Sequence, residues 1–439
     1  MRRLWALVGL AALGVSLAYC VSDTSNVTDG GGPDGGGSDS TVTDAASDAP
    51  PAEGFTMSLT PAHVTTDPGD SNVSVTINVS RAPSFAENVS FTIASPPAHV
   101  SASAPGDTGN TGTSSVFNVS VDSQATSGDV ALQVNGKSAS WSASATLQIR
   151  IGSILQVGSG TFTVPAYADH VIVKAWGAGG GGAFDKSGTV CEVMAPGGGG
   201  GFASALVPVT PSSSLEAIAG TGGGVGSGCA APVGGSGGGF SALRLQGASS
   251  YLVIAGGGGG GGEFANGAGG AGGGTVGQDG SGNCRGFGGS QTQGGVWDGG
   301  VTCPTPGRDG GPYVGGDGYT TTTGCEPPPG MPGGGHGAGN YNYCDDGAGG
   351  GGGGYFGGSG GGIGSNGSGG GGGSGYLITD AGTLTAGNGT AVANSGDPDF
   401  GLCGAGTGVG GKQGDLTAPP DSGAQPGGPG CIVVRLPKP

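Results

Sequence analysis

GGGGGGG (256–262) is the longest glycine run in this chain, and GAGGGG (177–182), GGGGG (197–201) and GGGGGG (349–354) are further runs of the same kind. Of the 112 glycines, 18 lie in residues 1–160 and the other 94 follow. Because each glycine in a helix interior costs roughly 1 kcal/mol relative to alanine, seven in a row exclude an α-helix. The runs predict either a flexible coil or extended helices with three residues per turn, packed side by side through backbone hydrogen bonds.

The flexible alternative is a Gly/Ser linker or a low-complexity tail. Against it, strand-like hydrophobic runs lie before, between and after the glycine runs, and eight of the nine cysteines lie in the same region. Collagen is excluded because no Gly-X-Y period is sustained. We therefore expect an ordered glycine-rich domain at 153–439, with strands within 160–256 and at 431–436, and a glycine-rich insertion at 257–430.

Three blocks repeat one plan of strand, turn, strand and glycine. They are GTFTVPAYADHVIVKAWGAGGGG (160–182), GFASALVPVTPSSSLEAIAGTGG (201–223) and GGGFSALRLQGASSYLVIAGGGG (237–259). CIVVRL (431–436) then supplies a closing strand after the long glycine-rich segment. Such an order predicts a Greek-key or jelly-roll sandwich, because that architecture tolerates long loops at its ends.

The amino terminus predicts secretion. Met1-Arg2-Arg3 precedes the apolar stretch LWALVGLAALGVSL (4–17), which is too short to span a bilayer as a mature helix. Residues 17–20, Leu-Ala-Tyr-Cys, resemble a bacterial lipobox, which makes residues 1–20 a lipoprotein signal and Cys20 the lipidated residue. The alternative is ordinary cleavage after Ala18. A lipidated Cys20 leaves an even set of eight cysteines for disulfides.

The next two segments differ in composition and in hydrophobic pattern. Residues 21–53 carry seven acids and no base among Gly, Ser, Thr and Pro, which predicts a solvated linker. From Phe55 the pattern becomes period-two alternation, as in SNVSVTINVSR (71–81) and SASWSASATLQIRI (138–151), with turn clusters between the runs. Six or seven short strands of this kind predict an Ig-like β-sandwich at 54–152. The predicted fold class is therefore mainly β.

The glycine-rich part resembles a known family in four blocks: VIVKAWGAGGGG (171–182), ASALVPVTPSSSLEAIAGTGGG (203–224), GGSGGGFSALRL (234–245) and YLVIAGGGGGGG (251–262). They look like the glycine-rich region of anaplastic lymphoma and leukocyte tyrosine kinase receptors, and like glycine-rich surface proteins of bacteria and phages. The resemblance implies a TNF-like sandwich carrying a bundle of polyglycine II helices. The receptors bind cytokines there, but this chain has no kinase, so signalling is not implied.

Pairing between sequence neighbours is the expectation for the eight cysteines, although 105 full pairings exist. The bridges are needed because glycine brings no apolar area to offset the entropy of ordering the chain. Zinc is the competing use, but no C-x2-C pair is present and His63 and His99 have no partner cluster, so we expect no metal site. The expected disulfides are Cys191–Cys229, Cys284–Cys303, Cys325–Cys344 and Cys403–Cys431.

In a glycine-rich sequence, apparent matches to catalytic motifs arise by chance. GTGVGGKQ (406–413) lacks the Ser/Thr that a phosphate loop needs after Lys412, and VIVKAWGAGGGG lacks the helix that a dinucleotide site requires. We expect no enzyme activity and no cofactor. The net charge of −17 argues against nucleic acid as a partner.

Two function classes remain open. One is a membrane-anchored bacterial surface protein that adheres to a glycan or a protein through aromatic residues in the glycine-rich domain. The other is a structural or spacer protein, in which the same rings cap the glycine bundle. The expected location is extracytoplasmic, at the outer membrane or cell surface. The candidate binding aromatics are Trp297, Tyr313, Tyr319, Tyr341, Tyr343, Tyr355 and Phe356.

Overall fold

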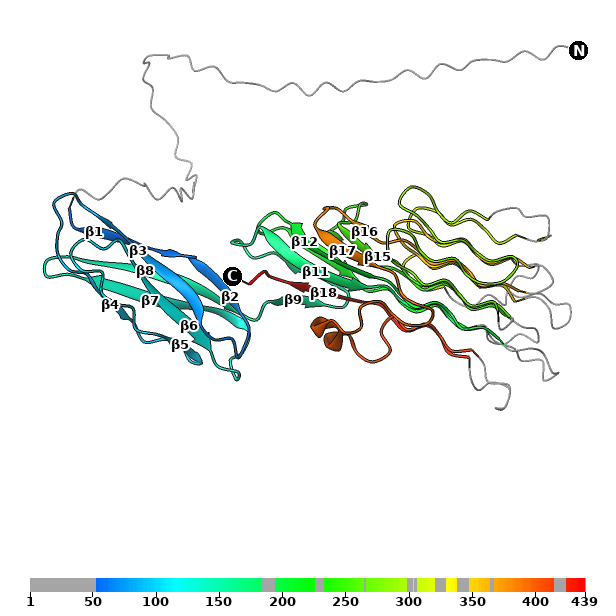
Figure 1. Cartoon of the computed structure of the whole chain (residues 1–439), viewed down its shortest axis with the longest axis horizontal. Helices are drawn as coiled ribbons and strands as arrows, with labels where there is room; N and C mark the ends of the chain where they lie inside the picture. Colours follow the sequence, from blue (N-terminus) through cyan, green and yellow to red (C-terminus); the bar gives the residue numbers. More distant parts are fainter. Residues whose placement is uncertain are drawn as a thin grey trace, which may run out of the picture. The chain divides into compact units, whose positions relative to one another are not determined.

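The computed structural model describes residues 53–183, 194–225, 233–263, 266–297, 303, 306–319, 329–337, 347–363, 367–413 and 424–438. The described chain is mainly β, with one short 3-10 helix, η1 (Pro398–Cys403) (Figure 1). No helix in the described ranges is long and apolar enough to cross a membrane.

The first set of strands forms two four-stranded sheets, in the orders β1-β3-β6-β5 and β2-β8-β7-β4. All neighbours pair antiparallel except β2 and β8, which are parallel. The strands are β1 (Phe55–Thr60), β2 (His63–Thr66), β3 (Val73–Arg81), β4 (Ser90–Ile93), β5 (Val100–Ala102), β6 (Ser114–Val121), β7 (Gly128–Lys137) and β8 (Ser142–Ile151).

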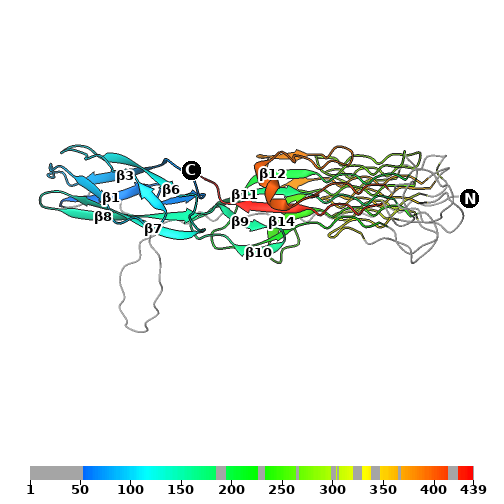
Figure 2. The ribbon, with the colours of Figure 1, turned by 90° about the horizontal axis from the view of Figure 1, so that it is seen from below.

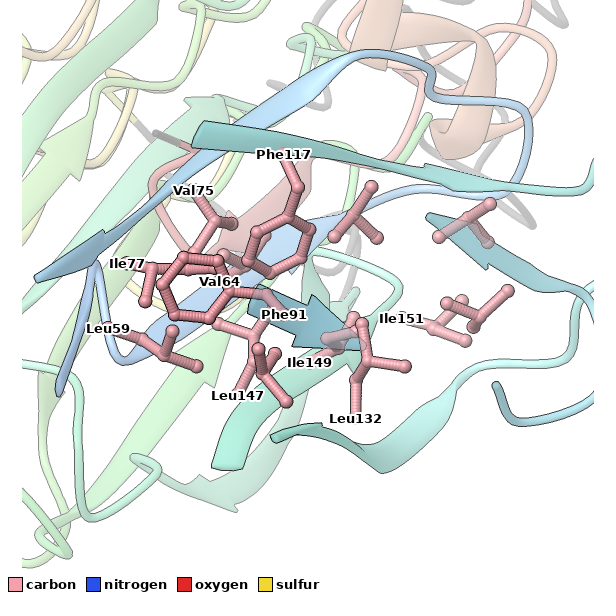
Figure 3. Close-up of a cluster of buried hydrophobic side chains, with 14 of the residues drawn as sticks. Leu59, Val64, Val75, Ile77, Phe91, Phe117, Leu132, Leu147, Ile149 and Ile151 are labelled. Atoms are coloured by element: carbon pink, nitrogen blue, oxygen red, sulfur yellow. The ribbon is translucent and has the colours of Figure 1, made fainter. Parts of the chain in front are cut away.

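Alternation along these strands builds one shared core. In β3, Val75, Ile77 and Val79 are buried while the residues between them are not. Side chains from both sheets meet in the same cluster, for example Phe117 of β6 and Leu147 of β8 (Figure 3). The period-two runs of the sequence thus do form strands, and β1, β2 and β5 bring the number described to eight.

The second set of strands forms two five-stranded sheets, in the orders β10-β13-β14-β15-β16 and β17-β12-β11-β18-β9. Their inward residues are mostly alanine and valine with a few leucines and one isoleucine, and they share a second core with members on both sheets. The strands are β9 (Ile154–Val157), β10 (Gly160–Thr163), β11 (His170–Trp176), β12 (Phe202–Pro208), β13 (Ser214–Ile218), β14 (Ser241–Leu245), β15 (Val253–Ala255), β16 (Tyr376–Leu377), β17 (Gly382–Thr385) and β18 (Cys431–Arg435).

Two of these strands come from within the expected insertion at 257–430. β16 pairs with β15, and β17 pairs with β12, so the insertion contributes an edge strand to each sheet. The sequence signal for them, YLITDAGTLT (376–385), is a short strand-turn-strand pattern surrounded by glycine. The expectation that only 160–256 and 431–436 supply strands was therefore too narrow.

The glycine segments run side by side beyond the sheets (Figure 2). In 177–183, the first, fourth and seventh N–H groups donate to carbonyls of 195–201, the second and fifth to 236–239, and the third and sixth to 425–428. The N···O distances are 2.8–3.1 Å. Bonding that repeats every third residue, to three different neighbours, is what an extended helix with three residues per turn requires.

Two disulfides join cysteines of the glycine-rich domain. Cys284 pairs with Cys303 and Cys403 pairs with Cys431, which are two of the four neighbour pairs expected from the sequence. Each bridge is expected to contribute about 2–4 kcal/mol to folding. The other two expected pairs, Cys191–Cys229 and Cys325–Cys344, lie outside the described residues.

An ion-pair cluster lies beside the Cys403–Cys431 bridge. Lys174 Nζ lies 2.8 Å from Oδ1 of Asp397 and 2.9 Å from Oδ2 of Asp399, and Arg435 also binds Asp399. Arg435 Nη1 further lies 3.4 Å from Oδ2 of Asp67.

The ion pairs shift the pKa values of the residues in this cluster. Burial alone would raise the pKa of Asp399, but its bonds to Arg435 and Lys174 outweigh burial and lower that pKa. Burial would lower the pKa of Lys174, but the two aspartates outweigh it and raise that pKa.

We expect Asp399→Asn to lower the free energy of unfolding at pH 7 by about 1–3 kcal/mol, because two cations lose a nearly buried carboxylate. A carboxylate whose folded pKa is lowered stabilises the fold above its unfolded pKa, and this contribution disappears as the pH falls through the folded pKa. Urea titrations should therefore separate the variant from the native chain at pH 7 and bring them together once the pH has fallen below the lowered pKa of Asp399. If the exposed control Asp380→Asn cost as much at pH 7, the cluster would not be the cause.

Candidate functional site

Six aromatic residues gather where the glycine segments meet one sheet. Phe240 immediately precedes β14, Tyr251 lies two residues before the start of β15, and Tyr376 is the first residue of β16. Phe240 is buried against Ala242 and Ile254, and the tyrosines pack over it while remaining partly exposed. The members of this aromatic cluster are Phe240, Tyr251, Tyr313, Tyr355, Phe356 and Tyr376.

Glycine segments place the remaining members. Tyr355 and Phe356 follow the run GGGGGG (349–354) directly, and Pro312 bridges to Phe356 in antiparallel fashion. Tyr313 lies in the turn Gly311–Val314, which is closed by N–H···O bonds in both directions of 2.7 and 3.2 Å. Its φ of 63° is a left-handed conformation that a bulky side chain rarely adopts. The turn therefore holds the Tyr313 ring against the cluster at a cost in backbone energy.

Neighbouring rings of the cluster contact one another in space. Ring centroids are 5.3 Å apart for Phe240 and Tyr251, 5.0 Å for Tyr251 and Tyr313, and 6.1 Å for Tyr313 and Tyr355. These three pairs are edge-to-face, whereas Tyr355 and Tyr376 are stacked at 4.3 Å with planes 19° apart. Edge-to-face and offset-stacked pairs are the favourable arrangements of aromatic rings, each adding about 0.5–1.5 kcal/mol beyond burial. These contacts thus link the rings into one continuous cluster.

The phenol hydroxyls of the cluster are unused by the protein. Among the described residues, none of the four tyrosine hydroxyls has a hydrogen-bond partner, and none is shut off from solvent. Tyr167, outside the cluster, differs because its hydroxyl is buried. A tyrosine that serves only to cover backbone needs no such exposure. The four free hydroxyls are therefore groups that a ligand can reach.

One cation borders the cluster. The guanidinium of Arg244 lies 5.5 Å from the centre of the Tyr251 ring, and its Nε donates to Oε2 of Glu216 at 2.8 Å. The hydrogen bond to Glu216 raises the pKa of Arg244, so this charge is held and compensated. Burial, followed by the neighbouring tyrosines, raises the pKa of Tyr313. The phenol of Tyr313 is accordingly neutral at physiological pH.

The seven aromatics predicted as binding candidates fall into three groups. Tyr313, Tyr355 and Phe356 are brought together. Trp297, whose backbone N–H donates to Asp309, and Tyr319 are partly exposed but make no ring contact with the cluster. The remaining two, Tyr341 and Tyr343, lie outside the described residues.

Phe240, Tyr251 and Tyr376 were missed by sequence reasoning, which looked for aromatics within glycine-rich loops. Phe240 and Tyr376 lie instead at a boundary between a glycine segment and a strand, and Tyr251 follows the turn between β14 and β15. Trp176 and Phe202 occupy boundaries of the same kind and form a separate buried group. For Phe240 and Tyr376 the usable signal was therefore the boundary position, where glycine segments enter the sheets.

His63 and His99 belong to no metal-binding group among the described residues. His63, the first residue of β2, stacks on Tyr167 with ring centroids 4.8 Å apart. His99 precedes β5 and lies 4.0 Å from Asp122 at the surface. Across the described ranges, no group of three or more His, Cys, Asp or Glu side chains is placed to hold a metal ion.

Comparison with known proteins does not show a family for this chain. No protein-family model matches the chain, and no curated protein matches it by sequence.

Proposed function

We propose that this chain is a non-enzymatic surface protein of a bacterium, anchored to a membrane through lipidated Cys20, whose glycine-rich domain binds a surface glycan or a protein. In this proposal residues 54–152 are an Ig-like sandwich and residues 153–439 a jelly-roll or TNF-like sandwich with polyglycine II segments. The signal-like amino terminus and the two disulfides support a place outside the cytoplasm.

The aromatic cluster carries the proposal. Tyrosine supplies a large, amphipathic contact area whose two side-chain torsions cost little entropy to fix, which is why it is enriched in binding surfaces. Here four tyrosines lie in mutual contact, partly exposed, with hydroxyls that no protein group uses. The strained turn at Tyr313 is a further sign, because such strain concentrates at functional sites.

A structural role is the second candidate. Phe240 is buried, and the other rings cover it at the entrance of the glycine segments. Rings that only cap bare backbone would account for this packing without a ligand. The two functions differ in whether the chain binds a ligand and in whether that binding depends on a ring of the cluster.

Binding of the full mature chain to glycan and protein arrays tests the proposal. We expect at least one ligand class to bind, and Tyr313→Ala to weaken that binding by about tenfold or more, as expected for a central aromatic residue. Val276→Ser, at an exposed residue outside the cluster, is the control and should leave binding unchanged. No binding above background by the native chain would leave the structural role in its place.

A further inference from the structure

We infer that the ligand of the aromatic cluster is a neutral, polyhydroxylated carbohydrate chain. This inference rests on the proposed binding function and names the class of ligand for the same site. It follows from the free hydroxyls, the fixed ring positions and the local charge of the cluster.

The hydroxyls define the chemistry of the ligand. Each tyrosine hydroxyl can donate one hydrogen bond and accept others, and the four in this cluster are reachable from solvent without a protein partner. A ligand rich in hydroxyl groups matches such a surface, since both partners donate and accept. A purely apolar ligand would leave these groups without partners and would lose affinity for that reason.

The rings are placed before any ligand arrives. Tyr251 is held between Phe240, Tyr313 and the guanidinium of Arg244, and Tyr355 is stacked on Tyr376. Rings fixed in this way lose little conformational entropy on binding. The apolar C–H face of a sugar can therefore pack on ring surface while its hydroxyl groups bond to the phenols.

Charge selects against acidic glycans. Arg244 is the cation beside the rings, and its charge is compensated by Glu216 at 2.8 Å. The chain as a whole carries a net charge of −17. A glycan bearing carboxylates or sulfates would be repelled by this field and would find no free cation in the cluster. A neutral sugar chain is the class that fits.

A protein partner would use a different part of the same surface. Val314 follows Tyr313 and is 52% exposed, so it offers the apolar contact that protein partners bury at the centre of an interface. A sugar chain bound through the phenols does not depend on this side chain. Val314→Ser therefore separates the two classes of partner.

Isothermal titration of the full mature chain with neutral oligosaccharides of glucose, mannose, galactose and N-acetylglucosamine tests the inference, with oligogalacturonate as the acidic probe. Tyr313→Phe and Tyr376→Phe remove one hydroxyl each and keep the ring, so we expect each to weaken binding of a neutral oligosaccharide by about 3- to 10-fold. Tyr319→Phe, outside the cluster, and Val314→Ser should change it less than about twofold. Unchanged melting temperatures would show that the variants fold.

Each other result overturns the inference. Neutral-sugar binding that Tyr313→Phe and Tyr376→Phe leave unchanged, or that Tyr319→Phe weakens equally, would place the sugar elsewhere. Binding of oligogalacturonate alone would contradict the argument from charge. If only a protein on the array bound, with Val314→Ser weakening it, the carbohydrate inference would fail while the proposed function stood. No binding of any probe would remove both.

Discussion

Gly258→Ala should prevent the glycine-rich domain from folding, or destabilise it by about 4 kcal/mol or more, which is beyond the usual range for a single substitution. Gly258 lies within the longest glycine run, donates its N–H to Ala178 at 3.0 Å and accepts from Gly238 at 2.8 Å. An added Cβ would come within 3.0 Å of backbone atoms of Gly198 and Gly199. Side chains can rotate away from an extra methyl group, but these neighbours are backbone that is itself hydrogen-bonded, so the added atom must break bonds.

Calorimetry of the full chain can measure this effect, because the two sets of sheets have separate cores and can unfold as separate transitions. A loss of this size should lower the transition of the glycine-rich domain by about 10 °C. Gly396→Ala is the matched control, since Gly396 is exposed and an added Cβ would meet nothing within 4 Å. If both variants melted like the native chain, the packing of bare backbone against bare backbone described above would be wrong.

The sequence predicts the character of the glycine segments but not their neighbours. The density of glycine was enough to exclude helices and to propose extended threefold segments, because that conclusion depends on each residue alone. Which segments lie beside 177–183 depends on partners up to about 250 residues away, and glycine carries no side chain that could encode the choice. The repeated blocks predicted the strands themselves, such as β11 and β12, but not that these two pair.

The same limit explains the outcome at the aromatic cluster. Tyr313 and Tyr355 were singled out from composition, because aromatics among glycines are conspicuous. Tyr376 and Tyr251 were overlooked because each reads as an ordinary strand residue or its neighbour. Tyr376 reaches the cluster, where it stacks on Tyr355, because the insertion returns to the sheet as β16. Strand-length signals weaken when a strand is only two residues long.

Trp176→Ala should lower the free energy of unfolding of the glycine-rich domain by about 3–5 kcal/mol, the range for deleting a buried tryptophan. Trp176 ends β11 and is fully buried. Its ring lies 5.1 Å from that of Phe202 and 5.5 Å from that of Phe400, beside the disulfide cysteines of the same core group. Replacing it with alanine leaves a cavity at the point where β11 passes into glycine, and the glycines beyond offer no side chain to fill it.

Trp176→Phe is the informative comparison for that cavity. Nε1 of Trp176 is buried and has no hydrogen-bond partner, so the indole contributes volume and ring contacts rather than a polar bond. Phenylalanine keeps most of that volume and removes the unpaired donor, which should limit the loss to about 1.5 kcal/mol or less. Thermal unfolding of the two variants should therefore differ by several degrees. Equal losses in both would mean that the indole N–H, and not the filled volume, stabilises this end of the sheet.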